Sequence, residues 1–190
     1  MLTLRSDKIK FGRQVCFPGG FVSKSDSSVV DTCLREMSEE IGLRPESTEI
    51  LGIMRCNWSD VASLTGIAVT PVVGFVGNID GSKLKLNKDE VEEVLIIPVR
   101  KALDRSKWIV RDYAAPVFSG SKYVIWGLTA YLLDHFLQEV LMKASSSAMI
   151  SFCGDWTFSG HETPPPPPPH APPQQISHCC FWDTSRRPTT

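Results

Sequence analysis

The chain has no excess of either charge, no long apolar run and no paired cysteine motif. Its 20 basic and 21 acidic residues give a formal charge of -1. This balance argues against nucleic acid as the main partner, because no basic excess exists to neutralise a phosphate backbone. The longest apolar stretch, residues 124–133, is too short to cross a bilayer, and the N-terminus lacks the apolar run of a secretory signal. The sequence therefore predicts no membrane span.

The six cysteines show no CxxC pair and no framework spacing, so we interpret them as reduced thiols of an intracellular protein without zinc. A hydrophobic content of 42% is enough for one globular core. Residues 143–190, by contrast, hold serines, an unbroken proline run at 164–169 and no periodic segment. We expect one domain at residues 1–142 and a disordered proline-rich tail at 143–190, which either is passive or binds an SH3 or WW domain.

One helix is predicted from the apolar residues Val30, Leu34, Met37 and Ile41. Their spacings of four, three and four place them on one stripe, which must face a core. A capping box at Ser28, or alternatively a cap at Asp26 or Ser27, begins the helix, and the glycine at position 42 ends it.

Three glutamates, Glu36, Glu39 and Glu40, fall together on another face of this helix. Arg35 is the only local cation at a suitable spacing. The pattern is typical either of a solvated helix face or of a site for a hard divalent ion such as Mg²⁺ or Mn²⁺, which prefers carboxylate and phosphate oxygens. Upstream, Gly20 ends a Pro-Gly-Gly turn that can bring backbone groups close to an ion or a phosphate.

The stretch Arg35-Glu36-Met37-Ser38-Glu39-Glu40-Ile41-Gly42-Leu43 resembles the second half of the signature of the Nudix hydrolases at every position. The first half departs from that signature in two ways. Gly20 lies one residue farther from Arg35 than the general pattern has it, and Asp26 stands where a glutamate is usual. The resemblance implies that Glu36, Glu39 and Glu40 bind Mg²⁺ or Mn²⁺, that Arg35 steadies them, and that Gly20 turns the loop toward the metal.

A second resemblance lies farther upstream. The run Leu2-Thr3-Leu4-Arg5-Ser6, leading to Phe17-Pro18-Gly19-Gly20, is similar to the motif of the coenzyme A diphosphatase branch of that family. The segment is one residue short, so that either Gly12 is displaced or Arg13 replaces the motif glycine. The basic residues Arg5, Lys10 and Arg13 are either solvated or contact substrate phosphates, and we predict the second role for them.

The fold that the resemblance implies is an α/β/α sandwich around a mixed sheet, with the N-terminal strand truncated. Extended segments are expected at 48–56, 67–76 and 94–97, a hairpin at 108–118 and a long helix at 124–141. Residues 89–93 hold a second acidic cluster, which is either an exposed turn or the source of one more ligand or base, such as Glu90.

The activity that the resemblance implies is metal-dependent hydrolysis of coenzyme A or acyl-CoA to 3′,5′-ADP and 4′-phosphopantetheine or its acyl form. That branch includes mitochondrial and peroxisomal enzymes, so an organelle is the expected compartment. Two alternatives stay open. One is a Nudix hydrolase of another nucleoside diphosphate derivative, such as NADH or ADP-ribose, and the other is a non-catalytic interaction protein.

Overall fold

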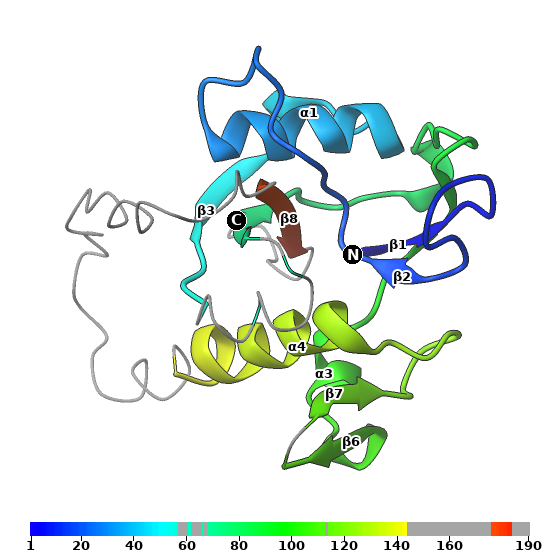
Figure 1. The fold of residues 1–190 in the computed structure, drawn as a ribbon, viewed down its shortest axis with the longest axis vertical. Coiled ribbons are helices and arrows are strands. Elements are labelled where there is room, and N and C mark those ends of the chain that lie inside the picture. Colours follow the sequence, from blue (N-terminus) through cyan, green and yellow to red (C-terminus); the bar gives the residue numbers. More distant parts are fainter. Residues whose placement is uncertain (57–60, 62–65, 67, 113, 144–175, 184–190) are drawn as a thin grey trace.

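Helices cover two opposite faces of the strands in the computed structural model, which describes residues 1–56, 61, 66, 68–112, 114–143 and 176–183. Helix α1 (Val29–Ile41) lies on one side and α4 (Gly127–His135) on the other (Figure 1). The strands are β1 (Leu2–Arg5), β2 (Val15–Cys16), β3 (Glu49–Ile53), β4 (Ala68–Phe75), β5 (Val91–Leu95), β6 (Trp108–Arg111), β7 (Ala114–Phe118) and β8 (Ile176–Asp183). A short helix, α3 (Val99–Ala102), follows β5. The predicted mixed α/β class is confirmed.

The strands form two three-stranded sheets and one hairpin. The first sheet has the order β2-β1-β5, with both pairings antiparallel, so β1 is its central strand. The second has the order β3-β4-β8, in which β3 is antiparallel and β8 parallel to β4. The second sheet is therefore mixed, as the sequence analysis expects, and β6 pairs with β7 as the predicted hairpin.

Strand β4 separates two hydrophobic clusters because neighbouring residues of a strand point to opposite faces. Val72 packs in a cluster with Cys33 and Met37 of α1, and all three are fully buried. Val73 belongs to the other cluster, which includes Phe136 and other apolar residues of the α4 region. This alternation positions α1 on one face of the sheet and α4 on the other.

Both ends of α1 are fixed as the sequence predicts. The hydroxyl oxygen of Ser28 accepts a hydrogen bond from the Asp31 N–H at 3.1 Å, which satisfies one of the free donors at the helix start. At the other end Gly42 adopts a left-handed φ of 69°, a conformation that favours glycine, and donates its N–H to the Ser38 carbonyl.

The C-terminal end of α1 is also bonded to a distant segment. The Lys85 N–H donates to the Ile41 carbonyl at 3.1 Å, and the Asn87 N–H donates to the Glu40 carbonyl at 2.9 Å. These bonds satisfy two carbonyls that a helix end leaves without an intrahelical donor. They hold the segment that leads into β5 against the helix that bears the three glutamates.

Two predicted boundaries are wrong, and one part of the tail differs from expectation. The expected helix at 124–141 begins only at Gly127, because Ile125 is extended and exchanges two backbone hydrogen bonds with Phe118; its second half is π-helical over Phe136–Met142. The strand expected at 94–97 is β5, which starts three residues earlier. Within the tail, β8 is a strand, and its apolar run 179–182 suits that conformation. Residues 144–175, with the proline run, and 184–190 lie outside the described residues.

Candidate active site

The glycine turn lies directly against the first glutamate of α1. A Cβ built on Gly20 would come within 2.3 Å of Glu36 Oε1, closer than real Cβ contacts allow. A side chain at position 20 would therefore displace the Glu36 carboxylate. The proximity that the sequence analysis expects between the turn and the acidic helix face is thus present in the structure.

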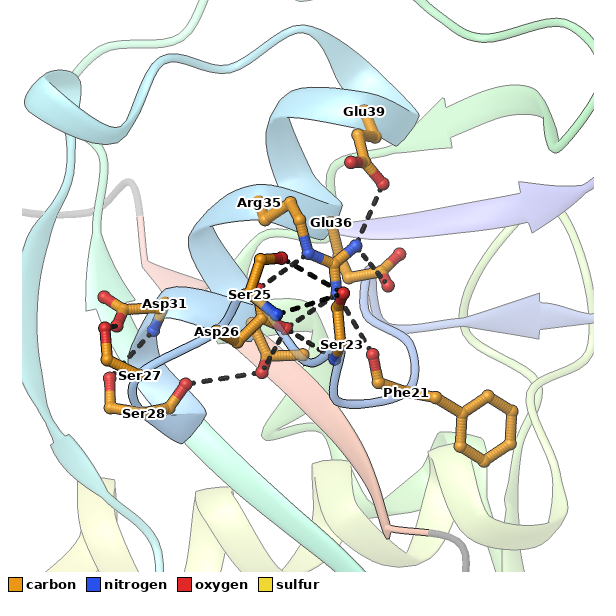
Figure 2. Close-up of polar contacts among 11 residues, drawn as sticks. Phe21, Ser23, Ser25, Asp26, Ser27, Ser28, Asp31, Arg35, Glu36 and Glu39 are labelled. Atoms are coloured by element: carbon orange, nitrogen blue, oxygen red, sulfur yellow. Dashed lines mark hydrogen bonds and ion pairs between the residues drawn. The ribbon is translucent and has the colours of Figure 1, made fainter.

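Arg35 is the centre of the site (Figure 2). Its Nε and Nη2 donate to the two carboxylate oxygens of Asp26, each at 3.0 Å, and this bidentate geometry suits a guanidinium. Its Nη1 donates to Glu36 Oε1 at 2.9 Å and to Glu39 Oε2 at 3.0 Å. Its Nη2 also donates to the Phe21 carbonyl at 3.0 Å. One side chain therefore fixes two of the three glutamates and the loop that follows the glycine turn.

Asp26 is the partner that the sequence analysis did not foresee for Arg35. Its side chain is only 4% exposed, and it also accepts hydrogen bonds from the Ser23 N–H at 2.8 Å and the Thr32 hydroxyl at 2.9 Å. The Arg35 guanidinium, followed by these donors, holds the pKa of the Asp26 carboxyl well below its usual range. Asp26 is thus a permanent anion that orients Arg35. The sequence did contain one signal for this role, since Asp26 stands where the Nudix signature usually has a glutamate.

Glu40 differs from its two neighbours because it is buried, with a relative exposure of 6%. Its carboxylate receives the Gly19 N–H, but Oε2 has no hydrogen-bond partner among the described residues. Burial, and next the charge of Glu36, raise the pKa of Glu40 to about 8. Burial also raises the pKa of Glu36. A buried carboxylate oxygen without a partner needs a proton or a cation.

The carboxylates fit a hard divalent ion in their chemistry, but they do not converge on one point. In the part of the chain that the structure describes, no three His, Cys, Asp or Glu side chains form a ready metal-binding group. The reason is that Arg35 holds Glu36 and Glu39, and Glu39 is 55% exposed. The unpartnered oxygen of Glu40, beside the charge of Glu36, is the feature that fits a cation. Binding by all three glutamates would require Glu36 and Glu39 to turn from Arg35 toward the ion.

Two of the basic residues predicted to contact substrate, Lys10 and Arg13, lie in the tight turn between β1 and β2, and Arg5 is the last residue of β1. Phe11 and Arg13 both have positive φ angles, 58° and 62°, and a Cβ on the intervening Gly12 would lie 2.5 Å from the Ser6 carbonyl oxygen. Such a conformation is costly for residues other than glycine. Gly12 is required for a steric reason, because a Cβ there would meet the Ser6 carbonyl, whereas Arg13 adopts a conformation that favours glycine. Both alternatives for the shortened motif therefore stay open.

This turn is joined to the second acidic cluster by ion pairs. Arg13 Nη1 lies 2.6 Å from Glu92 Oε2, and Lys8 Nζ lies 2.7 Å from Asp89 Oδ1. The antiparallel pairing of β1 with β5 brings the two segments together. Arg13 thus lies beside the acidic cluster at 89–93, but its guanidinium is already paired with the carboxylate of Glu92.

The other two predicted contacts have different surroundings. Arg5 Nη2 donates to the Lys10 carbonyl at 3.2 Å, its buried Nε has no partner among the described residues, and its charge lowers the pKa of Glu40. Lys10 Nζ lies 5.0 Å from the centre of the Phe11 ring. Arg5 is therefore within electrostatic reach of the glutamates, and the structure gives no such link for Lys10.

Glu90 stays a candidate for an additional carboxylate. Its charge contributes to the raised pKa of both Glu36 and Glu40, which places it near them. Its carbonyl accepts the Ser6 N–H at 2.8 Å, so the backbone that carries it is fixed to the end of β1. Asp89 lies in an exposed turn, as one alternative of the sequence analysis expects, whereas Glu92 and Glu93 belong to β5.

Comparison with known proteins agrees with this arrangement. The sequence matches the NUDIX domain family over residues 1–117, and the chain belongs to the Nudix family. It is 32% identical over 148 residues to a protein named uncharacterized Nudix hydrolase NudL from Pectobacterium atrosepticum, and 35% identical over 148 residues to the protein of that name from Citrobacter koseri; each match covers 74% of both chains. A third protein of this name, from Escherichia coli, is 32% identical over 151 residues, 75% of this chain and 76% of its own.

Family membership defines the class of reaction. The chain is a hydrolase that acts on phosphorus-containing anhydrides, and Nudix hydrolases generally use divalent metals such as Mg²⁺ or Mn²⁺. None of the helices in the described part of the chain has the length and apolar character that a bilayer crossing requires.

Proposed function

We propose that the chain hydrolyses the diphosphate bond of coenzyme A or a short acyl-CoA, giving 3′,5′-ADP and 4′-phosphopantetheine or its acyl form. One observation carries the proposal. The buried Oε2 of Glu40, which has no hydrogen-bond partner among the described residues, feels the charge of Glu36. The same carboxyl accepts the N–H of Gly19, a residue of the stretch 2–20 that is similar to the motif of coenzyme A diphosphatases. The effect of the Arg5 charge on Glu40, together with the Gly19 hydrogen bond, supports assigning the motif and the carboxylates to one site.

Each side chain of the site has a definite role in this proposal. Glu36, Glu39 and Glu40 hold Mg²⁺ or Mn²⁺, which, when bound, neutralises phosphate oxygens and makes a water molecule more acidic. Arg35, oriented by Asp26, holds Glu36 and Glu39 before the ion binds, and these two carboxylates would turn toward the ion in the bound state. A carboxylate accepts the proton of the attacking water, and both Glu36 and Glu90 are candidates for that role.

Arg5, Lys10 and Arg13 are proposed to contact the phosphates of the substrate. For Arg13 this requires an exchange, because its guanidinium pairs with both oxygens of Glu92, at 2.8 and 2.6 Å. Both of these bonds come from Nη1, and a phosphate also offers two acceptor oxygens and at least the same charge, so it can replace them. An Arg13→Ala variant is expected to raise the KM for coenzyme A, and a smaller rise for 3′-dephospho-coenzyme A would assign Arg13 to the 3′-phosphate.

One assay tests the proposed reaction. The purified chain is incubated with Mg²⁺ or Mn²⁺ and with coenzyme A, NADH or ADP-ribose in turn, and the products are separated and identified. We expect 3′,5′-ADP and 4′-phosphopantetheine, and loss of this cleavage in Glu40→Gln. Glu46→Gln, which changes an exposed glutamate in the turn Pro45–Ser47, is the matched control.

The other outcomes distinguish the alternatives. Cleavage of NADH or ADP-ribose alone would assign the chain to a different substrate branch of the family. A folded, manganese-bound chain that cleaves none of the three would favour the non-catalytic protein, for which the proline run at 164–169 supplies a predicted SH3 or WW ligand. The mitochondrial or peroxisomal location is likewise only proposed, from the family resemblance; the three relatives described above are bacterial.

A further inference from the structure

We infer that the side chain of Phe21 forms the subsite for the adenine ring of the substrate. This inference rests on the proposed function, since it assigns one part of the substrate to a surface beside the same carboxylates. It concerns a large apolar residue that is 52% exposed. An isolated exposed apolar residue is ordinary, so the argument depends on how this residue is held.

The backbone of Phe21 is attached to the catalytic helix. Its carbonyl accepts a hydrogen bond from Arg35 Nη2 at 3.0 Å, while Nη1 of the same guanidinium donates to Glu36 Oε1 at 2.9 Å. The preceding residue, Gly20, lies so close to the Glu36 carboxylate that an added Cβ would come within 2.3 Å of Oε1. A single guanidinium group therefore bridges the backbone of Phe21 and the carboxylate of Glu36, which holds the metal in the proposed mechanism.

The loop that carries the ring is fixed in advance of ligand binding. Two residues after Phe21, the Ser23 N–H donates to Asp26 Oδ2 at 2.8 Å, and the Asp26 N–H returns a bond to the Ser23 carbonyl at 3.0 Å. Asp26 is in turn bound to Arg35. Figure 2 shows the Phe21 ring pointing away from these contacts. A ring on an ordered loop loses little further conformational entropy when a ligand covers it.

The chemistry of the substrate supplies a matching group. Coenzyme A, NADH and ADP-ribose all carry an adenosine on one side of the diphosphate. When the diphosphate lies at the glutamates, the adenine is a short distance away, beyond one ribose. A flat aromatic base prefers an offset face of a phenyl ring to water, and such stacking needs no particular hydrogen-bonding edge. Phe21 is thus suited to all three substrates equally.

The test compares Phe21→Ala, which keeps the carbonyl that Arg35 binds, with Phe21→Trp, which keeps an aromatic face. Val22→Ala is the matched control, because Val22 is the adjacent residue, apolar and 45% exposed. For Phe21→Ala we expect KM to rise about five- to tenfold for whichever of coenzyme A, NADH and ADP-ribose the chain cleaves, with kcat changed less than about twofold. Phe21→Trp and Val22→Ala should stay within about twofold of the wild type.

A binding measurement makes the inference independent of turnover. Saturation-transfer NMR with ADP and Mg²⁺ is expected to show contact between the protein and the adenine protons H2 and H8 in the wild type, and a clear loss of that signal in Phe21→Ala. If the wild type cleaves none of the substrates but this loss occurs, the adenine subsite stands and the proposed function falls. Unchanged KM and unchanged ADP contact in Phe21→Ala would overturn the subsite while the proposed function stands. A KM effect on coenzyme A with unchanged ADP contact would place the ring at the pantetheine arm and overturn it as well.

Discussion

Replacing Glu40 by glutamine should make the metal-free protein more stable at neutral pH. The carboxyl of Glu40 has an ordinary pKa of 4.5 in the unfolded chain, and burial raises the pKa to about 8 in the folded chain. Between these values the folded chain binds more protons than the unfolded chain, so the free energy of unfolding falls as pH rises. The stability that this group contributes is therefore fully present below about pH 4.5 and is lost as pH rises toward 8.

The size of the effect follows from the shift. One pKa unit corresponds to about 1.4 kcal/mol, so the buried charge costs about 3 kcal/mol at pH 7 and about 1 kcal/mol at pH 5. Glutamine keeps an oxygen for the Gly19 N–H, but its amide group would lack a partner, at a cost of about 1 kcal/mol. We therefore expect Glu40→Gln to exceed the wild type by about 2 kcal/mol at pH 7 and to be nearly equal to it at pH 5.

The assay is urea denaturation of both proteins in EDTA at several values between pH 5 and 8. Glu39→Gln is the matched control, because it removes the same charge from the same helix at a side chain that is 55% exposed. Its stability should follow the pH dependence of the wild type. Parallel curves for the wild type and Glu40→Gln over this range, or a less stable Glu40→Gln at pH 7, would refute the reasoning. Addition of Mn²⁺ at pH 8 should stabilise the wild type and not Glu40→Gln.

Three further substitutions test other parts of the site and its support. Gly20→Ala should displace the Glu36 carboxylate and lower manganese affinity at least about tenfold in calorimetric titration. Gly81→Ala, where an added Cβ meets nothing within 4 Å, should leave the affinity unchanged, and equal affinities of the two variants would contradict a role of the close approach between Gly20 and Glu36. Asp26→Asn should weaken the orientation of the arginine and reduce kcat/KM about 10- to 100-fold, and an unchanged value would show that the pair is dispensable. Met37→Ala, at a fully buried position, should lower the free energy of unfolding by about 2–5 kcal/mol in urea, and a loss under about 1 kcal/mol would contradict the packing described.

Much of α1 could be predicted because its signals are local. The apolar stripe, the cap at Ser28 and the terminal Gly42 all act within a few residues, and each is present in the structure. Thr32 and Cys33 are also fully buried, which the stripe alone did not indicate. The carboxylate face was predicted from the same periodicity, but the burial of Glu40 was not. Its burial depends on the glycine turn and on neighbouring strands rather than on the helix.

Contacts between distant segments could not be predicted from the pattern. Arg13 and Glu92 are 79 residues apart, and their ion pair depends on the register of β1 against β5. The local sequence around each residue indicates only a basic loop and an acidic cluster, and does not indicate that the two are paired. The predicted start of α4 was wrong for a similar reason. The local sequence suits a helix, but backbone pairing with Phe118 holds Ile125 in an extended conformation. Local propensity is a weak guide where tertiary pairing competes with it.

The bonds from Lys85 and Asn87 to the last carbonyls of α1 have a consequence for hydrogen exchange. These two amide protons lie outside the helix in sequence, yet they can exchange with solvent only when the end of the helix releases them. Their exchange rates therefore report the opening of the glutamate-bearing helix from a position that carries none of its charges. Slowed exchange at both amides on addition of manganese would register the tightening of that helix without any substrate present.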